Sequence, residues 1–145
     1  MLFRSALIVC LGLVAAGLYG SAAEEKESAP AKERARLENA KARGEAAKKA
    51  YVAALERHAH QPEIVGSDVP YLWSVRWFQA ERDFSKSKAD RMAASERHLK
   101  RMQGWRERTL GAAKAGGIGP DEVSGAEFYV LEAEDWLMAA QGETK

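Results

Sequence analysis

Histidines are the residues of this chain whose spacing most directly suggests chemistry. His58 and His60 form an H-x-H pair, and Glu63 follows three residues later. Imidazole nitrogens and carboxylate oxygens bind zinc, but a structural zinc site needs four ligands at fixed positions. A histidine near the C-terminus of a helix is also explained by the helix dipole. Metal or small-ligand binding through His58 and His60 therefore stays an alternative, and the sequence predicts no cofactor.

The residue patterns of common catalytic sites do not occur in the sequence. No serine stands in a nucleophile-elbow pattern, and no glycine-rich loop has the phosphate-binding form. Adjacent acids such as Glu134 and Asp135 would point in different directions on a helix. We therefore predict that the protein is not an enzyme.

Aromatic residues concentrate in one stretch, VPYLWSVRWFQAERDF, at positions 69–84. On a helix, three of these rings would share one face and a fourth would lie on its flank. Two arginines and two acids accompany them, and this balanced charge argues against a base-stacking surface for nucleic acid. We expect a core or a protein-binding face made of these four rings and one further tryptophan: Trp73, Trp77, Phe78, Phe84 and Trp105.

The elements that would position these residues are helices. Small and apolar residues recur every three or four positions over 31–59, and Pro62 and Gly66 then break the pattern. Good helix formers continue from 69 to 115, with Pro70 in the first turn and no proline after it, predicting one helix about 70 Å long. A third helix is expected from Pro120 to Gly142. The predicted class is all-α, with three helices forming antiparallel, coiled-coil-like hairpins around one long central helix.

Charge predicts how the last two helices pair. Residues 86–114 carry nine Lys or Arg against three acids, whereas residues 121–145 carry seven acids and one Lys. Opposite charge favours an antiparallel last helix on the second half of the central one, with Leu137 near Leu99, although exposed ion pairs contribute little energy. The helical-hairpin domain is expected over residues 35–145.

The first residues resemble a secretory signal peptide. Arg4 precedes an apolar run of fifteen residues, and Ser21 and Ala23 suit cleavage after residue 23. An uncleaved anchor is the alternative. Cleavage would remove Cys10, the one cysteine, and leave a chain with 21 basic and 21 acidic residues. We expect a disordered charged leader over 24–34, export to the periplasm or the extracellular space, no nucleic-acid partner and no membrane span in the mature chain.

The pattern from the first helix into the second resembles the α-helical hairpins of TolC-type outer-membrane efflux proteins. A glycine-containing turn separates the two halves of the pattern, and a second echo runs from Gly119 to Glu134. The matching residues are Ala47, Tyr51, Leu55, Gly66, Asp68, Val69, Ala80, Glu81, Ala89 and Leu99. The resemblance implies an envelope protein associated with efflux. Those proteins are several times longer and contribute β-strands to a barrel, and nothing in this sequence is typical of a strand.

These observations favour an exported, non-enzymatic helical-hairpin protein that acts as a structural or protein-interaction module in the cell envelope. A protein partner or self-association is expected. A component of a TolC-type efflux system and a small-ligand or metal-binding helical protein are the two alternatives.

Overall fold

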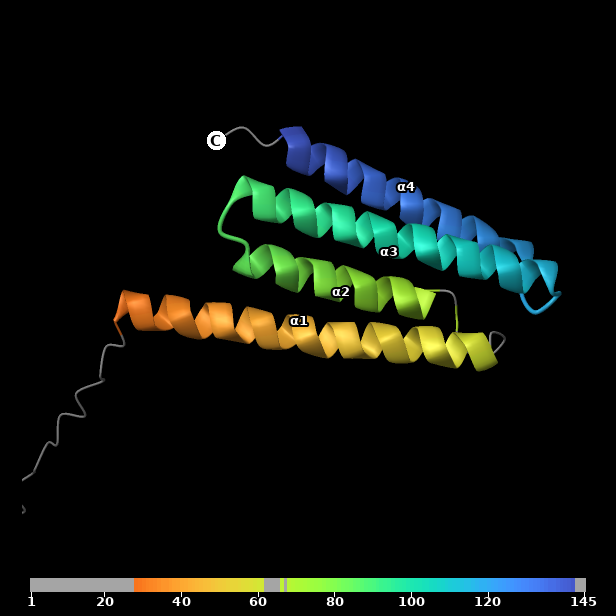
Figure 1. The fold of residues 1–145 in the computed structure, drawn as a ribbon, viewed down its shortest axis with the longest axis horizontal. Helices are drawn as coiled ribbons and strands as arrows, with labels where there is room; N and C mark the ends of the chain where they lie inside the picture. Colours follow the sequence, from red (N-terminus) through yellow and green to blue (C-terminus); the bar gives the residue numbers. More distant parts are fainter. Residues whose placement is uncertain (1–27, 62–65, 67, 143–145) are drawn as a thin grey trace, which may run out of the picture.

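Four helices make up the fold in a computed structural model that describes residues 28–61, 66 and 68–142. They are α1 (Ala29–His60), α2 (Asp68–Phe84), α3 (Lys88–Lys114) and α4 (Pro120–Gly142). Successive helices run antiparallel and lie in chain order across the molecule (Figure 1). The all-α prediction is confirmed for the described residues. The predicted signal peptide lies outside them.

The single central helix predicted over 69–115 is wrong, because the chain turns at 85–87. The Ser85 hydroxyl donates to the Glu81 carbonyl oxygen at 2.7 Å, which satisfies one carbonyl at the end of α2. Ser87 then caps α3: its hydroxyl accepts from the Asp90 N–H at 3.1 Å, and the Asp90 carboxylate accepts from the Ser87 N–H at 3.1 Å. This reciprocal capping box starts a new helix. The turn lets α2 and α3 bury their apolar faces against each other.

α1 and α2 pack large side chains against small ones. Gly44 is buried in α1, and a Cβ atom added there would lie 3.6 Å from Ala80 Cβ and 3.7 Å from the Phe84 ring. Outside the apolar contact, Arg43 donates to Asp83 at 2.6 Å. The helix predicted over 31–59 is confirmed with slightly wider bounds. Its start at Ala29 places residues 29–34 in α1 rather than in the charged leader.

α3 and α4 form the second hairpin, in the antiparallel pairing that the charge pattern predicts. Gly116 adopts φ 75°, and the N–H groups of Gly116 and Gly117 donate to the carbonyls of Ala113 and Ala112. This is the Schellman arrangement, in which the left-handed position favours glycine. The predicted start of the last helix at Pro120 is confirmed.

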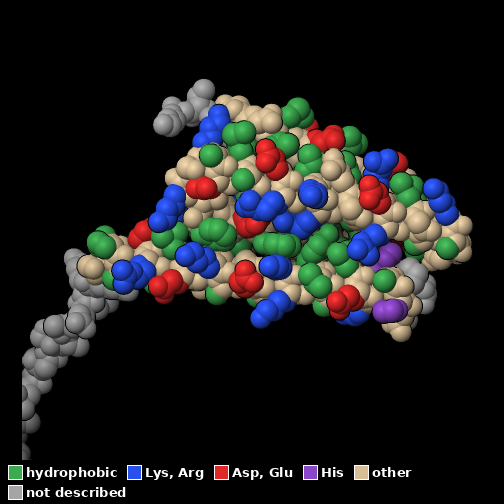
Figure 2. All heavy atoms as spheres, viewed as in Figure 1, with side chains coloured by type: hydrophobic (Ala, Val, Ile, Leu, Met, Phe, Trp, Pro, Cys, Tyr) green, Lys and Arg blue, Asp and Glu red, His purple; other side chains and the backbone are tan. Residues whose placement is uncertain are grey.

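The two hairpins meet along α2 and α3 and share one core. Trp105 and Met102 of α3 have no solvent exposure and pack with Tyr51 of α1 and Val130 of α4. Apolar side chains fill the junction between α1 and the helices above it (Figure 2). Within the described residues, no helix combines the length and apolar character needed to cross a lipid bilayer.

Candidate functional site

The aromatic stretch of α2 is divided between two sides of that helix. Trp73, Trp77 and Phe84 are half-buried, and the Trp77 ring lies 6.1 Å from the Tyr51 ring of α1. Phe78 points the other way and is 3% exposed. It stacks on the rings of His98 and Trp136 at centroid distances of 5.0 Å and 5.2 Å. The stretch therefore joins α2 to α1 on one side and to α3 and α4 on the other.

Guanidinium groups lie over the faces of the half-buried tryptophans Trp73 and Trp77. The Arg76 guanidinium carbon lies 4.5 Å from the centroid of the Trp73 ring, and that of Arg101 lies 4.0 Å from the Trp77 ring. Cations at these distances are attracted to the electron-rich ring face. These contacts occupy the ring faces that a ligand would otherwise use.

A buried group of polar side chains joins α2 to α3, and we name it the polar seam: Ser74, Glu81, His98 and Arg101. Arg101 Nε donates to Ser74 Oγ at 2.8 Å, and Ser74 Oγ lies 2.9 Å from His98 Nδ1. The Arg101 guanidinium forms an ion pair with Glu81 at 3.6 Å, too long for a hydrogen bond. Arg97, half-exposed, donates to the other Glu81 oxygen at 2.9 Å.

Burial and a neighbouring cation determine the charge state of His98. Arginine only donates, so the Ser74 oxygen accepts from Arg101, and the same oxygen is the hydrogen-bond partner of His98 Nδ1. His98 Nε2 is buried without a partner among the described residues. Burial, reinforced by the Arg101 charge, lowers the pKa of His98 to about 3. His98 is therefore neutral, and no solvent reaches it or Ser74.

The two candidate metal ligands lie in different environments at the end of α1. His58 is 5% exposed, and its ring meets the Trp105 ring edge-on with centroids 4.5 Å apart. Burial first, and then the charge of Arg108, lowers the pKa of His58. His60 is exposed, and Glu63 lies outside the described residues. No group of three or more His, Cys, Asp or Glu in the described part of the chain could hold a metal ion.

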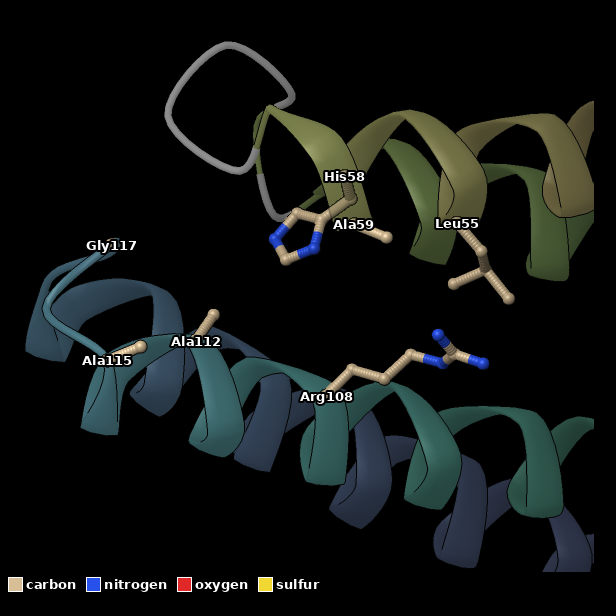
Figure 3. Close-up of a pocket in the computed structure, with 7 residues that line it drawn as sticks. All are labelled: Leu55, His58, Ala59, Arg108, Ala112, Ala115 and Gly117. Atoms are coloured by element: carbon tan, nitrogen blue, oxygen red, sulfur yellow. The ribbon is translucent and has the colours of Figure 1, made fainter.

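His58 also lines a cleft between the C-terminal ends of α1 and α3, which we name the end cleft (Figure 3). Its volume is about 340 Å³. The walls carry short apolar side chains, one imidazole and one guanidinium: Leu55, His58, Ala59, Arg108, Ala112, Ala115 and Gly117. An apolar cavity of this size with few polar groups is typical of a small-molecule site.

The outer face of α4 is the second surface that packing leaves open. Phe128, Leu131 and Met138 are 59%, 61% and 59% exposed. They lie on the side of α4 opposite its buried residues Ala126 and Val130. In many proteins, a group of neighbouring large apolar side chains that are this exposed marks a contact surface, whereas isolated exposed apolar side chains do not.

Sequence reasoning missed the polar seam and the role of Trp136. Periodicity counts Glu81, His98 and Arg101 as polar and so places them toward solvent. The available signal was the spacing of these residues. Steps of four and then three separate Ser74, Phe78 and Glu81. Steps of three and then four separate His98, Arg101 and Trp105. Each set shares one helix face, so the polar members accompany a buried ring.

Comparisons with protein-family models, with curated proteins and with solved structures found no match for this chain. The resemblance to the hairpins of TolC-type proteins therefore rests on the sequence pattern alone.

Proposed function

We propose that the protein is an exported, non-enzymatic helical module that binds a protein partner through the outer face of α4. The exposed side chains of Phe128, Leu131 and Met138 carry this proposal. Export rests on the apolar segment at residues 1–23, which has the layout of a signal peptide.

The spacing of the exposed residues suits a helical partner. With Asp135 included, the positions on the outer face follow steps of three, four and three: Phe128, Leu131, Asp135 and Met138. This period forms a straight stripe, and helix-in-groove and coiled-coil contacts use such stripes. A partner helix would cover the three apolar side chains and would meet one carboxylate between them.

Charge indicates that the partner helix is basic. α4 carries no Lys or Arg and has six acids: Asp121, Glu122, Glu127, Glu132, Glu134 and Asp135. Charge complementarity selects partners and disfavours like-charged ones. A partner with apolar residues three or four apart and Lys or Arg on their flanks would satisfy both features of this face.

The same residues disfavour pairing of α4 with a second copy of itself. In an antiparallel pair that aligns Phe128 with Met138, Leu131 of each helix would lie opposite Asp135 of the other. A parallel pair would bring the two Asp135 carboxylates together. Either symmetric contact places a charge against an apolar group or a like charge, which costs free energy.

Binding of a designed peptide tests the proposal. The probe is a 14-residue helical peptide of Leu and Lys with Leu at three- and four-residue steps, and its control replaces every Lys by Glu. In calorimetry, we expect the protein to bind the Lys peptide and not the Glu peptide. The Phe128→Ser/Leu131→Ser protein should bind it at least about tenfold more weakly, because exposed apolar anchors dominate such contacts.

A matched variant controls for general loss of surface apolarity. Val52→Ser/Leu72→Ser removes two other exposed apolar side chains, 44% and 43% exposed, and should bind like the unaltered protein. Equal loss in both variants, or equal binding of both peptides, would contradict the proposal. A dimer in sedimentation that Phe128→Ser/Leu131→Ser dissociates would replace it with self-association.

A further inference from the structure

The end cleft exists because two helices extend beyond the helix between them. α1 and α3 both continue past the start of α2 at this end of the molecule (Figure 1). The residues that face each other there are short, with Ala59 on α1 and Ala112 on α3. Alanine side chains do not fill the separation between the two backbones, so the end cleft stays open.

One wall of the end cleft presents a positive charge. The Arg108 side chain extends from α3 along the end cleft toward Leu55 (Figure 3). Among the described residues, no carboxylate forms an ion pair with Arg108. A guanidinium beside an apolar surface is a specific partner for a carboxylate, which it can bind through two parallel hydrogen bonds.

His58 adds a polar group on the opposite wall. Its ring projects from α1 toward α3 (Figure 3). The same ring meets the Trp105 ring edge-on. The lowered pKa of His58 leaves the imidazole neutral near pH 7, so it offers one N–H donor and one acceptor. The positive charge of the end cleft therefore comes from Arg108.

We propose that the end cleft binds a small amphipathic carboxylate. Its alkyl part would lie against Leu55, Ala59 and Ala112, and its carboxylate would pair with Arg108. An amine would be repelled by the guanidinium, and a neutral alcohol would leave it without a charged partner. An inorganic anion would pair with Arg108 but would make no apolar contact with the walls. The positive charge and the apolar walls together therefore identify an amphipathic carboxylate as the ligand class.

Octanoate is the probe, with octanol and octylamine as controls of equal chain length. The readout is the set of imidazole signals in the NMR spectrum, where His60 and His98 serve as internal references outside the end cleft. We expect octanoate to shift the His58 signals saturably and to leave those of His98 unchanged. Octanol should bind at least about tenfold more weakly, since a charged hydrogen bond is lost.

Two variants with matched controls test each half of the site. Arg108→Gln should weaken octanoate binding about tenfold, while Arg106→Gln, a neighbouring exposed arginine outside the end cleft, should not. Ala112→Leu should fill the end cleft and abolish binding, while Ala53→Leu on the exposed side of α1 should not. Thermal unfolding of each variant verifies that the fold is retained.

Four results would overturn the proposal. The first is no saturable shift of His58 at millimolar octanoate. The second is equal binding of octanoate and octanol, and the third is no effect of Arg108→Gln on octanoate binding. The fourth is a parallel shift of His98, which would indicate detergent-like loosening of the core. None of these results bears on peptide binding by α4, so this proposal and the proposed function fail separately.

Discussion

The polar seam and the outer face of α4 are opposites in chemistry and position. The polar seam places a carboxylate, a guanidinium, a hydroxyl and an imidazole in the interior between α2 and α3. The outer face of α4 places Phe128, Leu131 and Met138 in solvent. Each region departs from the usual separation of apolar interior and polar surface.

The two departures have different physical consequences. A buried polar group costs free energy unless it is paired, and the observed register of α2 on α3 pairs Arg101 with both Ser74 and Glu81. The polar seam therefore favours this packing of the two hairpins. The three apolar side chains of the stripe on α4 are each more than half exposed, so the stripe is open to another molecule.

The largest expected effect comes from breaking the polar seam. Glu81→Ala would leave the Arg101 guanidinium, whose side chain is 9% exposed, in the interior without its carboxylate. We expect the free energy of unfolding to fall by about 3–5 kcal/mol, measured by urea denaturation. Asp83→Ala is the matched control: it removes the exposed ion pair with Arg43 and should cost less than about 1 kcal/mol. If the two variants lost similar free energies of unfolding, burial of the Glu81–Arg101 ion pair would make no difference to the cost of breaking it.

Acid should weaken the same region by a smaller amount. The pKa of His98 is about 3 in the folded protein, against an ordinary value of 6.5, so below 6.5 the unfolded chain binds a proton that the folded chain excludes. Stability is therefore fully present above about pH 6.5 and falls as the pH drops toward 3. We expect a loss of about 2 kcal/mol between pH 7.5 and pH 5.

Denaturation of His98→Gln at the two pH values provides the control for the acid effect. This variant should lose most of the pH dependence and keep only the smaller share due to His58, whose pKa is also lowered. The pKa values of Asp90 and Asp121 are also lowered, from an ordinary value of 3.8. These two groups change stability mainly below pH 3.8, which is outside the range from pH 5 to pH 7.5 compared in this experiment. An imidazole of His98 that titrates near pH 6.5 in the folded protein would contradict the assignment.

The smallest expected effect is on the outer face of α4. Phe128→Ser and Leu131→Ser should each change the free energy of unfolding by no more than about 0.5 kcal/mol, because their side chains contribute little to the core. Val130→Ser, one residue away and 7% exposed, should cost about 2–3 kcal/mol. Comparable losses at Leu131 and Val130, measured by thermal denaturation, would mean that the outer face is part of the fold rather than a contact surface.

Local sequence signals predicted most of the helices, and one overlooked local signal explains the main error. The stripes around Gly44 and Tyr51 and the glycine turn before Pro120 predict α1 and α4 correctly. The break between α2 and α3 was also encoded, since Ser87 and Asp90 have the spacing of a capping box. Strong helix formers on both sides obscured this capping signal. Helix propensity is summed over many residues, whereas a capping box involves only a few positions at the start of one helix.

The amino-acid sequence was sufficient to predict the all-α class and the approximate ends of α1 and α4. These features depend on residues close in the chain and on the helical period. Three further features became evident only from the packing of the helices. Glu81, His98 and Arg101 are interior, Phe78 faces Trp136, and His58 and Arg108 line one cleft. Burial of a side chain depends on what lies opposite it, and that partner comes from another helix.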